Sequence, residues 1–339
     1  MKKLRIGFDS YCLSSKNMMP VEVIKWASEN GAEGVSFSGY KDETRELFTS
    51  SYLRDVKQMA DELGFYLEWG CGQHIPLDTV SFKPKEILLS NRKAIGEAYG
   101  LGVNIIRSRS DGLIRWNKDS PSTEIILKAT AKELQKQSSM FRDNGITLAI
   151  ETQLDFTTFE LLRLFEMCET EPGDYLGICL DPMNLITMLE DPLTATDRIL
   201  PWIVSSQIKD GAILLDESGM TTFPVPIGKG VIDLEAIINR LVSEDRDIPL
   251  SVKDHGGSHV LPINESWFIE RFPDLSFKEY DNLLEMTGFS LEKKLNSDLR
   301  VTDPGDWPLI CEERTKENIL NIKLLRDRLS AEEPKEPED

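Results

Sequence analysis

The stretch that decides the fold is GITLAIETQLDFTTFELLRLFEMCETEPGDYLGICLDP, residues 145–182. Two short β-rich runs, ITLAIET (146–152) and LGICLD (176–181), flank a segment that begins at Thr157 and carries apolar residues at helical spacing. A buried strand, a helix and a second buried strand make a βαβ unit, whose two strands lie parallel. Each strand ends at or beside a carboxylate, Glu151 in the first and Asp181 in the second.

The same alternation continues on both sides of this unit. Six more runs read as strands: LRIGFDS (4–10), GVSF (34–37), FYLEWG (65–70), VNIIRSRS (103–110), IVSSQIKD (203–210) and IPLSVKD (248–254). Helices are expected from Pro20 to about Gly31, over 50–63, 85–99 and 122–144, after Asp191-Pro192, after Asp233 as its cap, and over 309–329. Eight strands with intervening helices predict an α/β protein, a single (β/α)₈ TIM barrel over residues 1–330.

Two segments fall outside the regular alternation. Residues 255–308 lie between the eighth strand and the last helix and are rich in aromatic residues. Barrel topology makes them a βα loop at the catalytic mouth, so we expect a helical insertion that acts as a lid or a partner surface. An extra packing layer on the barrel's flank is the alternative. The tail AEEPKEPED (331–339) is too polar to fold and is expected to be an acidic, disordered terminus.

Composition excludes several classes of protein. The 39 basic and 58 acidic residues give a net charge of −19, which repels phosphodiester backbones, so no nucleic-acid partner is expected. No apolar run approaches the roughly 18 residues that cross a bilayer, and the start lacks a secretory signal. We therefore expect a cytoplasmic protein without a membrane partner. The five cysteines are scattered and form no CxxC pair, which argues against a zinc knuckle or a disulfide framework.

Four polar residues lie at the ends of four consecutive strands. They are Glu151, Asp181, Gln207 and Lys253. The carboxyl ends of barrel strands converge, so these side chains are expected to share one pocket. Two carboxylates and an amide oxygen are hard ligands that suit Mg²⁺ or Mn²⁺, and Zn²⁺ is conceivable. The alternative is that each carboxylate caps the following helix or pairs with a neighbouring cation.

The endings AIET, LDPMN, SQIKD and SVKDHGG resemble those of the xylose isomerase-like barrels, which include sugar-phosphate isomerases and keto-sugar 3-epimerases. The resemblance covers residues 4 to 257. It implies one divalent metal, held by a glutamate, an aspartate, a histidine and a glutamate on strands five to eight, with the two glutamates shuttling a proton. Glu151 and Asp181 match this pattern, whereas Gln207 stands in place of the histidine and Lys253 in place of the second glutamate.

Lys253 puts the metal in doubt. Glu151 and Asp181 would balance a divalent cation, and a protonated lysine beside it would leave an uncompensated positive charge. Either Lys253 replaces the metal by pairing with the carboxylates, or it turns away, towards Glu68. In the second case a metal stays on Glu151, Asp181 and Gln207, with His255 or water completing the shell. We expect metal binding to be weak or absent.

The resemblance implies a sugar isomerase or epimerase that acts on a small keto sugar or sugar acid through an enolate, with Glu151 and Lys253 as catalytic residues. A cationic lysine suits stabilisation of an enolate, so decarboxylation or elimination is the alternative. The segments DHGG, FPDL and WPLICEER also resemble a branch that contains keto-sugar-acid decarboxylases. A non-catalytic carbohydrate-binding barrel that lost its metal is a further reading. Three histidines and the acidic balance argue against DNA repair of the endonuclease IV type.

Further candidates lie near the strand ends. His74 can act as an acid or base near neutral pH or be a hydrogen-bonded bystander. Arg107 suits a substrate carboxylate or phosphate, with an ion pair to Glu68 as the alternative. Lys209 alternates with Gln207 and is expected to face the pocket, where it joins Glu68 and His255 as a substrate contact. The expected partner is a small carbohydrate, and a homo-oligomer is left open.

Overall fold

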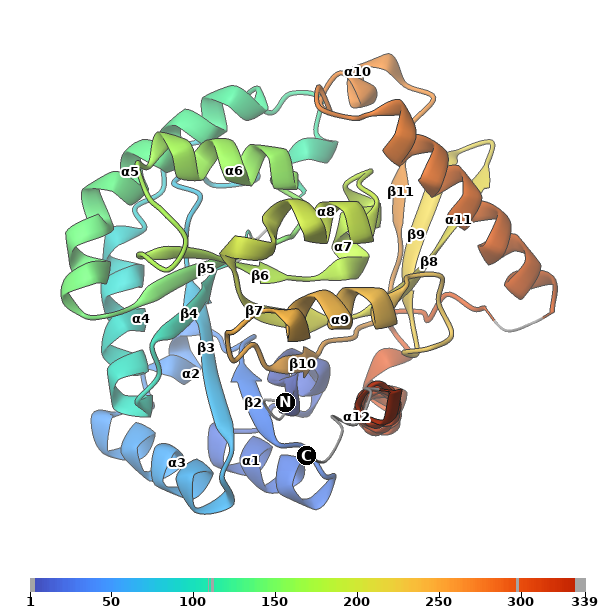
Figure 1. Ribbon diagram of the computed structural model, residues 1–339. Helices are drawn as coiled ribbons and strands as arrows, with labels where there is room; N and C mark the ends of the chain where they lie inside the picture. Colours follow the sequence, from blue (N-terminus) through green and yellow to red (C-terminus); the bar gives the residue numbers. More distant parts are fainter. Residues whose placement is uncertain (1–3, 109, 111–112, 297–298, 333–339) are drawn as a thin grey trace, which may run out of the picture.

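A computed structural model describes residues 4–108, 110, 113–296 and 299–332 (Figure 1). Eight parallel strands close into a barrel in the order β1-β10-β7-β6-β5-β4-β3-β2, which confirms the predicted TIM barrel. The strands are β1 (Ile6–Asp9), β2 (Gly34–Phe37), β3 (Tyr66–Gly72), β4 (Ile105–Ser108), β5 (Thr147–Glu151), β6 (Leu176–Leu180), β7 (Ile203–Ile208) and β10 (Leu250–Val252).

Helices cover the outside of the barrel. They are α1 (Pro20–Glu29), α2 (Asp42–Arg45), α3 (Ser50–Leu63), α4 (Leu88–Leu101), α5 (Thr123–Asp143), α6 (Thr158–Met167), α7 (Pro182–Thr187), α8 (Pro192–Ile199), α9 (Leu234–Ser243) and α12 (Trp307–Glu332), with 3₁₀ turns η1 (Ser10–Lys16), η2 (Ile114–Trp116) and η3 (Leu200–Trp202). Local sequence explains several starts. Thr157 and Glu160 form a reciprocal capping box on α6, and Asp233 caps α9 by accepting from Ala236, as predicted.

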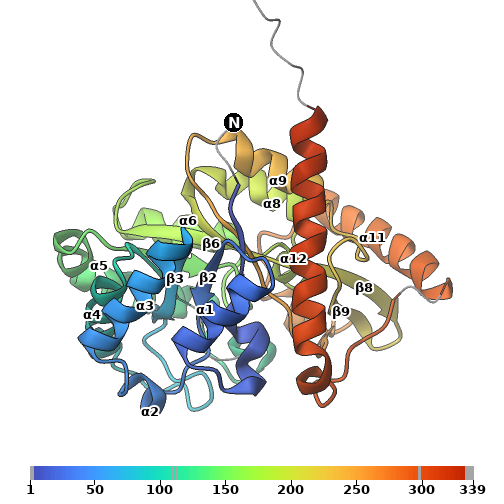
Figure 2. The same cartoon turned by 90° about the horizontal axis from the view of Figure 1, so that it is seen from below.

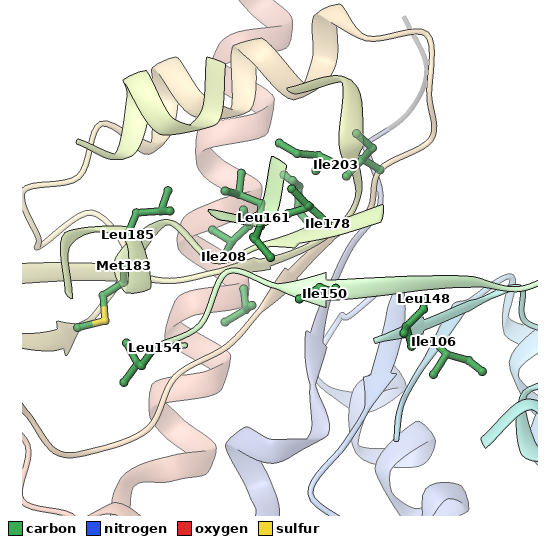
Figure 3. Packing of buried hydrophobic residues seen from close by; sticks show 14 of the residues in the cluster. Ile106, Leu148, Ile150, Leu154, Leu161, Ile178, Met183, Leu185, Ile203 and Ile208 are labelled. Carbon is green, nitrogen blue, oxygen red and sulfur yellow. The ribbon is translucent and has the colours of Figure 1, made fainter. Parts of the chain in front are cut away.

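The core joins the strands to the helices around them. Ile150, Ile178 and Ile208 are fully buried on three neighbouring strands, and Leu161 of α6 packs over this side of the barrel (Figure 3). Since barrel strands are covered on both sides, any charged side chain within them must find a partner inside the protein.

The structure adds a sheet that the sequence analysis did not predict. After β7 the chain turns into an antiparallel hairpin of β8 (Asp210–Asp216) and β9 (Gly219–Val225), and β11 (His259–Leu261) pairs with β9. The sequence pattern predicts no strand between residue 210 and the cap at Asp233. The hairpin lies at the end of a strand that already fits the barrel pattern, so the alternation of strands and helices gave no signal for it.

The segment expected to form a helical insertion contains β11, α10 (Ser266–Ile269) and α11 (Phe277–Leu295). Helix α11 packs against the hairpin, where the Ser290 hydroxyl accepts from the backbone N–H of Ile213 at 3.1 Å. Figure 2 shows α11 beside β8 and β9, with the long α12 running along the barrel between them and α1. The predicted tail at 331–339 overlaps the last two residues of α12 and otherwise falls outside the described residues.

Within the described part of the chain, no helix combines the length and the apolar character that a membrane crossing requires.

Candidate active site

A cavity of about 300 Å³, here called the mouth cavity, lies at the carboxyl ends of the barrel strands. Its wall comes from segments that directly follow the strands: Tyr11 after β1, Ser110 and Leu113 after β4, Gln153 and Leu154 after β5, Asn184 in α7, Lys209 after β7, and Lys253 and His255 after β10. His259 of β11 completes it, so the unpredicted sheet contributes to the site.

Lys253 ends a chain of alternating charges that crosses the barrel. Its ammonium donates to Oε1 of Glu151 at 2.5 Å, and the other carboxylate oxygen of Glu151 accepts from Nη1 of Arg107. Nη2 of Arg107 lies 2.5 Å from Oδ2 of Asp9. Burial favours the protonated form of Glu151, but Lys253 and Arg107 outweigh it and hold the pKa of Glu151 well below its usual range.

Arg107 is enclosed within this network. It is 1% exposed, and its charge is retained because Asp9 and Glu151 outweigh the cost of burial and raise its pKa. Gly70 leaves room for it, since a Cβ there would lie 2.8 Å from Nη2. Arg107 therefore pairs with Asp9 and Glu151 rather than with Glu68, the partner named as its alternative. Arg107 is not among the described residues that line the mouth cavity, so its guanidinium does not face a ligand there.

Asp181 and Lys209 form a second ion pair beside the first. Nζ of Lys209 lies 2.8 Å from Oδ2 of Asp181 and donates to Asn184 Oδ1 at 3.3 Å. Asp181 also caps α7 by accepting from the backbone N–H groups of Met183 and Asn184, which is the helix-capping alternative stated for it. Burial lowers the pKa of Lys209, but Asp181 outweighs this and raises it, so Lys209 is cationic.

The donor set does not fit a divalent metal. Both oxygens of Glu151 are held by cations, and Asp181 is shared between Lys209 and a helix N-terminus. Gln207 donates to Ser36 at 3.3 Å and keeps a buried amide oxygen with no hydrogen-bond partner among the described residues. No group of three or more acidic, histidine or cysteine side chains with metal-binding geometry occurs in the described part of the chain. A cation placed here would meet two ammonium groups.

The three histidines have different surroundings. Burial, reinforced by Lys209, lowers the pKa of His255 to about 3 and also lowers that of His259, so both are neutral in the cavity wall. His74 is fully buried, with Nε2 2.6 Å from Oδ2 of Asp155 and Nδ1 2.7 Å from the Ser108 hydroxyl. His74 has the surroundings of a hydrogen-bonded bystander and is not among the described residues of the cavity wall.

Glu68 lies inside the barrel rather than at its mouth. Burial raises its pKa to about 7, against the opposing effects of Ser205, Arg107 and Ser36. Lys253 does not turn towards Glu68, which was the alternative stated for it, because it pairs with Glu151. Glu68 is a buried neighbour of the network and does not belong to the described lining of the cavity.

Several residues of the site were not singled out from the sequence. Tyr11, Gln153 and Asn184 each lie two or three residues beyond a strand-ending carboxylate, so the same rule that found Glu151 and Asp181 extends to them. Asp9 ends β1, so the rule that singled out the strand-ending carboxylate Glu151 would have found Asp9 as well. His259 had no such signal, because it reaches the mouth only through the pairing of β11 with β9.

Solved structures with this architecture are numerous. An L-ribulose 3-epimerase superposes with a TM-score of 0.61 at 16% identity, covering 99% of this chain and 100% of the other. The probable 3-DHS dehydratase AsbF of Bacillus anthracis gives 0.56 at 14% identity, covering 87% and 99%. The 3-keto-D-glucoside 4-epimerase YcjR of Escherichia coli gives 0.56 at 14%, covering 74% and 92%. At these identities the likeness concerns the fold.

Two curated relatives match over shorter stretches. The 3-oxo-isoapionate decarboxylase of Pectobacterium atrosepticum is 29% identical over 110 residues, 32% of this chain and 39% of that protein. The uncharacterized protein YihM of Escherichia coli strain K12 is 27% identical over 124 residues, 37% of each. The matches thus span well under half of either relative. A family profile described as xylose isomerase-like TIM barrel matches residues 24–267, most of the chain. The chain belongs to the xylose isomerase-like TIM barrel family.

Proposed function

We propose that this protein is a sugar-modifying enzyme that forms an enolate from a keto sugar acid without a divalent metal, and that its reaction is decarboxylation. The observation that carries the proposal is the pair of ammonium groups, Lys209 and Lys253, that line the mouth cavity while their carboxylate partners lie behind them. A ligand in the cavity meets positive charge, which favours an anionic substrate and an anionic transition state.

The chemistry of such a site needs an electron sink. In a substrate with a carbonyl β to its carboxylate, the bond between the carboxylate carbon and the α-carbon breaks, and carbon dioxide leaves. The electron pair moves to the carbonyl oxygen and gives an enolate, which Lys253 and Lys209 are placed to stabilise. The α-carbon then takes a proton from solvent. This first step needs no base, which agrees with the engagement of Glu151 by two cations.

Glu151, Asp9 and Arg107 have a positioning role in this proposal. Their alternating charges keep the Lys253 ammonium paired and in place in the wall of the cavity. The neutral His255 and His259, together with Gln153 and Asn184, supply hydrogen-bonding groups for the hydroxyls of a sugar chain. The partial match to a 3-oxo-isoapionate decarboxylase supports the same reaction class.

The test is release of carbon dioxide from a panel of 3-oxo sugar acids by the purified full-length chain, with and without a chelator. We expect turnover that the chelator does not reduce and that added Mn²⁺ does not raise. A chelator-sensitive rate, or stoichiometric metal in the purified protein, would contradict the replacement of the metal by lysine.

Isomerisation or epimerisation through the same enolate is the second candidate, favoured by the family and by the epimerases of the same fold. It requires a base to remove the α-proton, and in this site a deprotonated lysine would have to serve. Solvent deuterium incorporation into a neutral keto sugar, without loss of carbon dioxide, would select this candidate over decarboxylation.

A further inference from the structure

A second cavity of about 310 Å³, here called the β1–β2 cavity, lies between the loops that follow strands β1 and β2. These loops leave the carboxyl ends of the strands, on the same face of the barrel as the mouth cavity. The two linings share no residue, and η1 separates them: Tyr11 lines the mouth cavity, whereas its neighbours Ser10 and Ser14 line the other.

The lining of the β1–β2 cavity differs in kind from that of the mouth cavity. Its polar side chains are Ser10, Ser14, Ser38, Tyr40, Thr44 and Asn17, interrupted by the apolar Leu13, Met18 and Val23. Ser14, Asn17 and Thr44 are exposed or half-buried and supply the hydroxyl and amide groups that a ligand can reach. Among the described residues of this wall only Lys41 is charged, and its side chain is exposed. Hydroxyls that donate and accept, alternating with apolar patches, match the hydroxyls and the C–H faces of an uncharged sugar.

Hydrogen bonds hold the two loops of this cavity together. The Ser10 hydroxyl donates to the carbonyl of Ser38 at 3.0 Å and accepts from the backbone N–H of Ser38 at 2.8 Å, which fixes one loop against the other. The Ser38 hydroxyl donates to Oδ1 of Asp9, the carboxylate whose other oxygen pairs with Arg107. The cavity is therefore fastened to the charged network of the proposed active site.

Tyr40 contributes a ring that is held by packing. The ring stacks on Trp69 and makes an edge contact with Phe48, and its hydroxyl is buried beside the Ser10 side chain. This side of the wall is therefore fixed in the absence of a ligand.

We infer that the β1–β2 cavity is a subsite for an uncharged sugar or polyol group, so that the substrate is an extended molecule with its keto-acid end in the mouth cavity. Only the placement of the keto-acid end in the mouth cavity rests on the proposed function. Tyr11 would lie under the junction of the two groups: its ring packs on Gly39, where a Cβ would come within 3.0 Å of Cδ2, and meets His255 edge-on at 6.0 Å between ring centres.

The test is direct binding of methyl β-D-glucopyranoside, measured by saturation-transfer NMR and calorimetry on the full-length chain. Ser14→Trp fills the cavity from its exposed rim, and Ser28→Trp on the outer face of α1 is the matched control. We expect binding to the wild type and the control, and binding to Ser14→Trp that is at least about tenfold weaker because the volume is occupied.

Three outcomes would overturn the subsite: no binding to the wild type, equal binding to wild type and Ser14→Trp, or displacement of the glycoside by malonate, which would place it in the mouth cavity. Thermal unfolding of each variant shows whether it is still folded. Because binding is read without turnover, failure of the proposed reaction would leave glycoside binding intact. Loss of glycoside binding with intact decarboxylation would reject the subsite alone.

Discussion

Among the described residues, Arg107 and Arg198 each bridge two buried carboxylates. Arg107 lies between Asp9 and Glu151 inside the barrel. Arg198 of α8 lies between Glu190, at 3.0 Å, and Glu279 of α11, and it stacks 3.6 Å above the centre of the Phe159 ring. The two clusters share the same chemistry and the same burial of their carboxylates.

The two clusters differ in their surroundings. The Arg107 cluster ends in Lys253, which lines the mouth cavity. The Arg198 cluster joins the insertion to the barrel, and none of its described residues lines that cavity. A buried ion pair is therefore weak evidence for function, because structural ion pairs and ion pairs in active sites use the same types of residue. The cavity beside the Arg107 cluster is the feature that distinguishes it.

The sharpest way to break the comparison is to remove each arginine in turn. Arg107→Met and Arg198→Met each leave two buried carboxylates without their shared cation, so each should lower the free energy of unfolding by about 3–5 kcal/mol in urea titrations. Turnover per folded molecule should fall only in Arg107→Met, because only this arginine holds Glu151 and, through it, Lys253. An equal fall in Arg198→Met would show that the insertion cluster belongs to the active site.

A smaller effect is expected from Lys253→Met, which leaves Glu151 paired with Arg107. We expect kcat for decarboxylation to fall about 10²- to 10³-fold, as for loss of one group that stabilises a developing oxyanion. The melting temperature should change little, because Glu151 keeps one cation. Lys316→Met on α12, whose lysine pairs with Glu313, is the control and should leave kcat unchanged. A kcat for Lys253→Met within twofold of wild type would remove Lys253 from the mechanism.

The smallest effect concerns pH. Burial raises the pKa of Glu190 to about 7, against the opposing hydrogen bonds from Thr158 and the charge of Arg198. Between its usual pKa and this value the unfolded chain releases a proton that the folded chain keeps, so stability falls as pH rises through that window. Glu190→Gln should be about 1–3 kcal/mol more stable than wild type above pH 7, with the difference vanishing near pH 4.

Urea unfolding at several pH values measures this difference. The buried Glu68 has the same raised pKa, so part of the wild-type slope should persist in Glu190→Gln and become smaller in the double variant with Glu68→Gln. Asp210, whose pKa burial raises to about 6, should keep a part of the slope in both variants. A slope that Glu190→Gln leaves unchanged would mean that Glu190 is ionised in the folded protein at neutral pH.

Much of this site could be placed from sequence because barrel geometry is so regular. Glu151, Asp181 and Lys253 each end or follow an apolar strand, and the convergence of strand ends brings their charges close together. Gln207 lies within β7 and donates to Ser36 of β2 instead. The pairing of those residues could not be predicted. Whether Lys253 met Glu151 or Glu68 depended on the register of β10 against β7 and on closure of the ring, which no local pattern reports.

The amino-acid sequence alone determined the barrel, the order of its strands and the residue types at their ends, because apolar periodicity and capping are local properties. Tertiary structure alone decided that Arg107 lies behind Glu151 rather than in the cavity, that Lys209 holds Asp181, and that β11 carries His259 to the mouth. These are contacts between residues far apart in the chain, and their energies depend on distances that only the closed, packed barrel fixes.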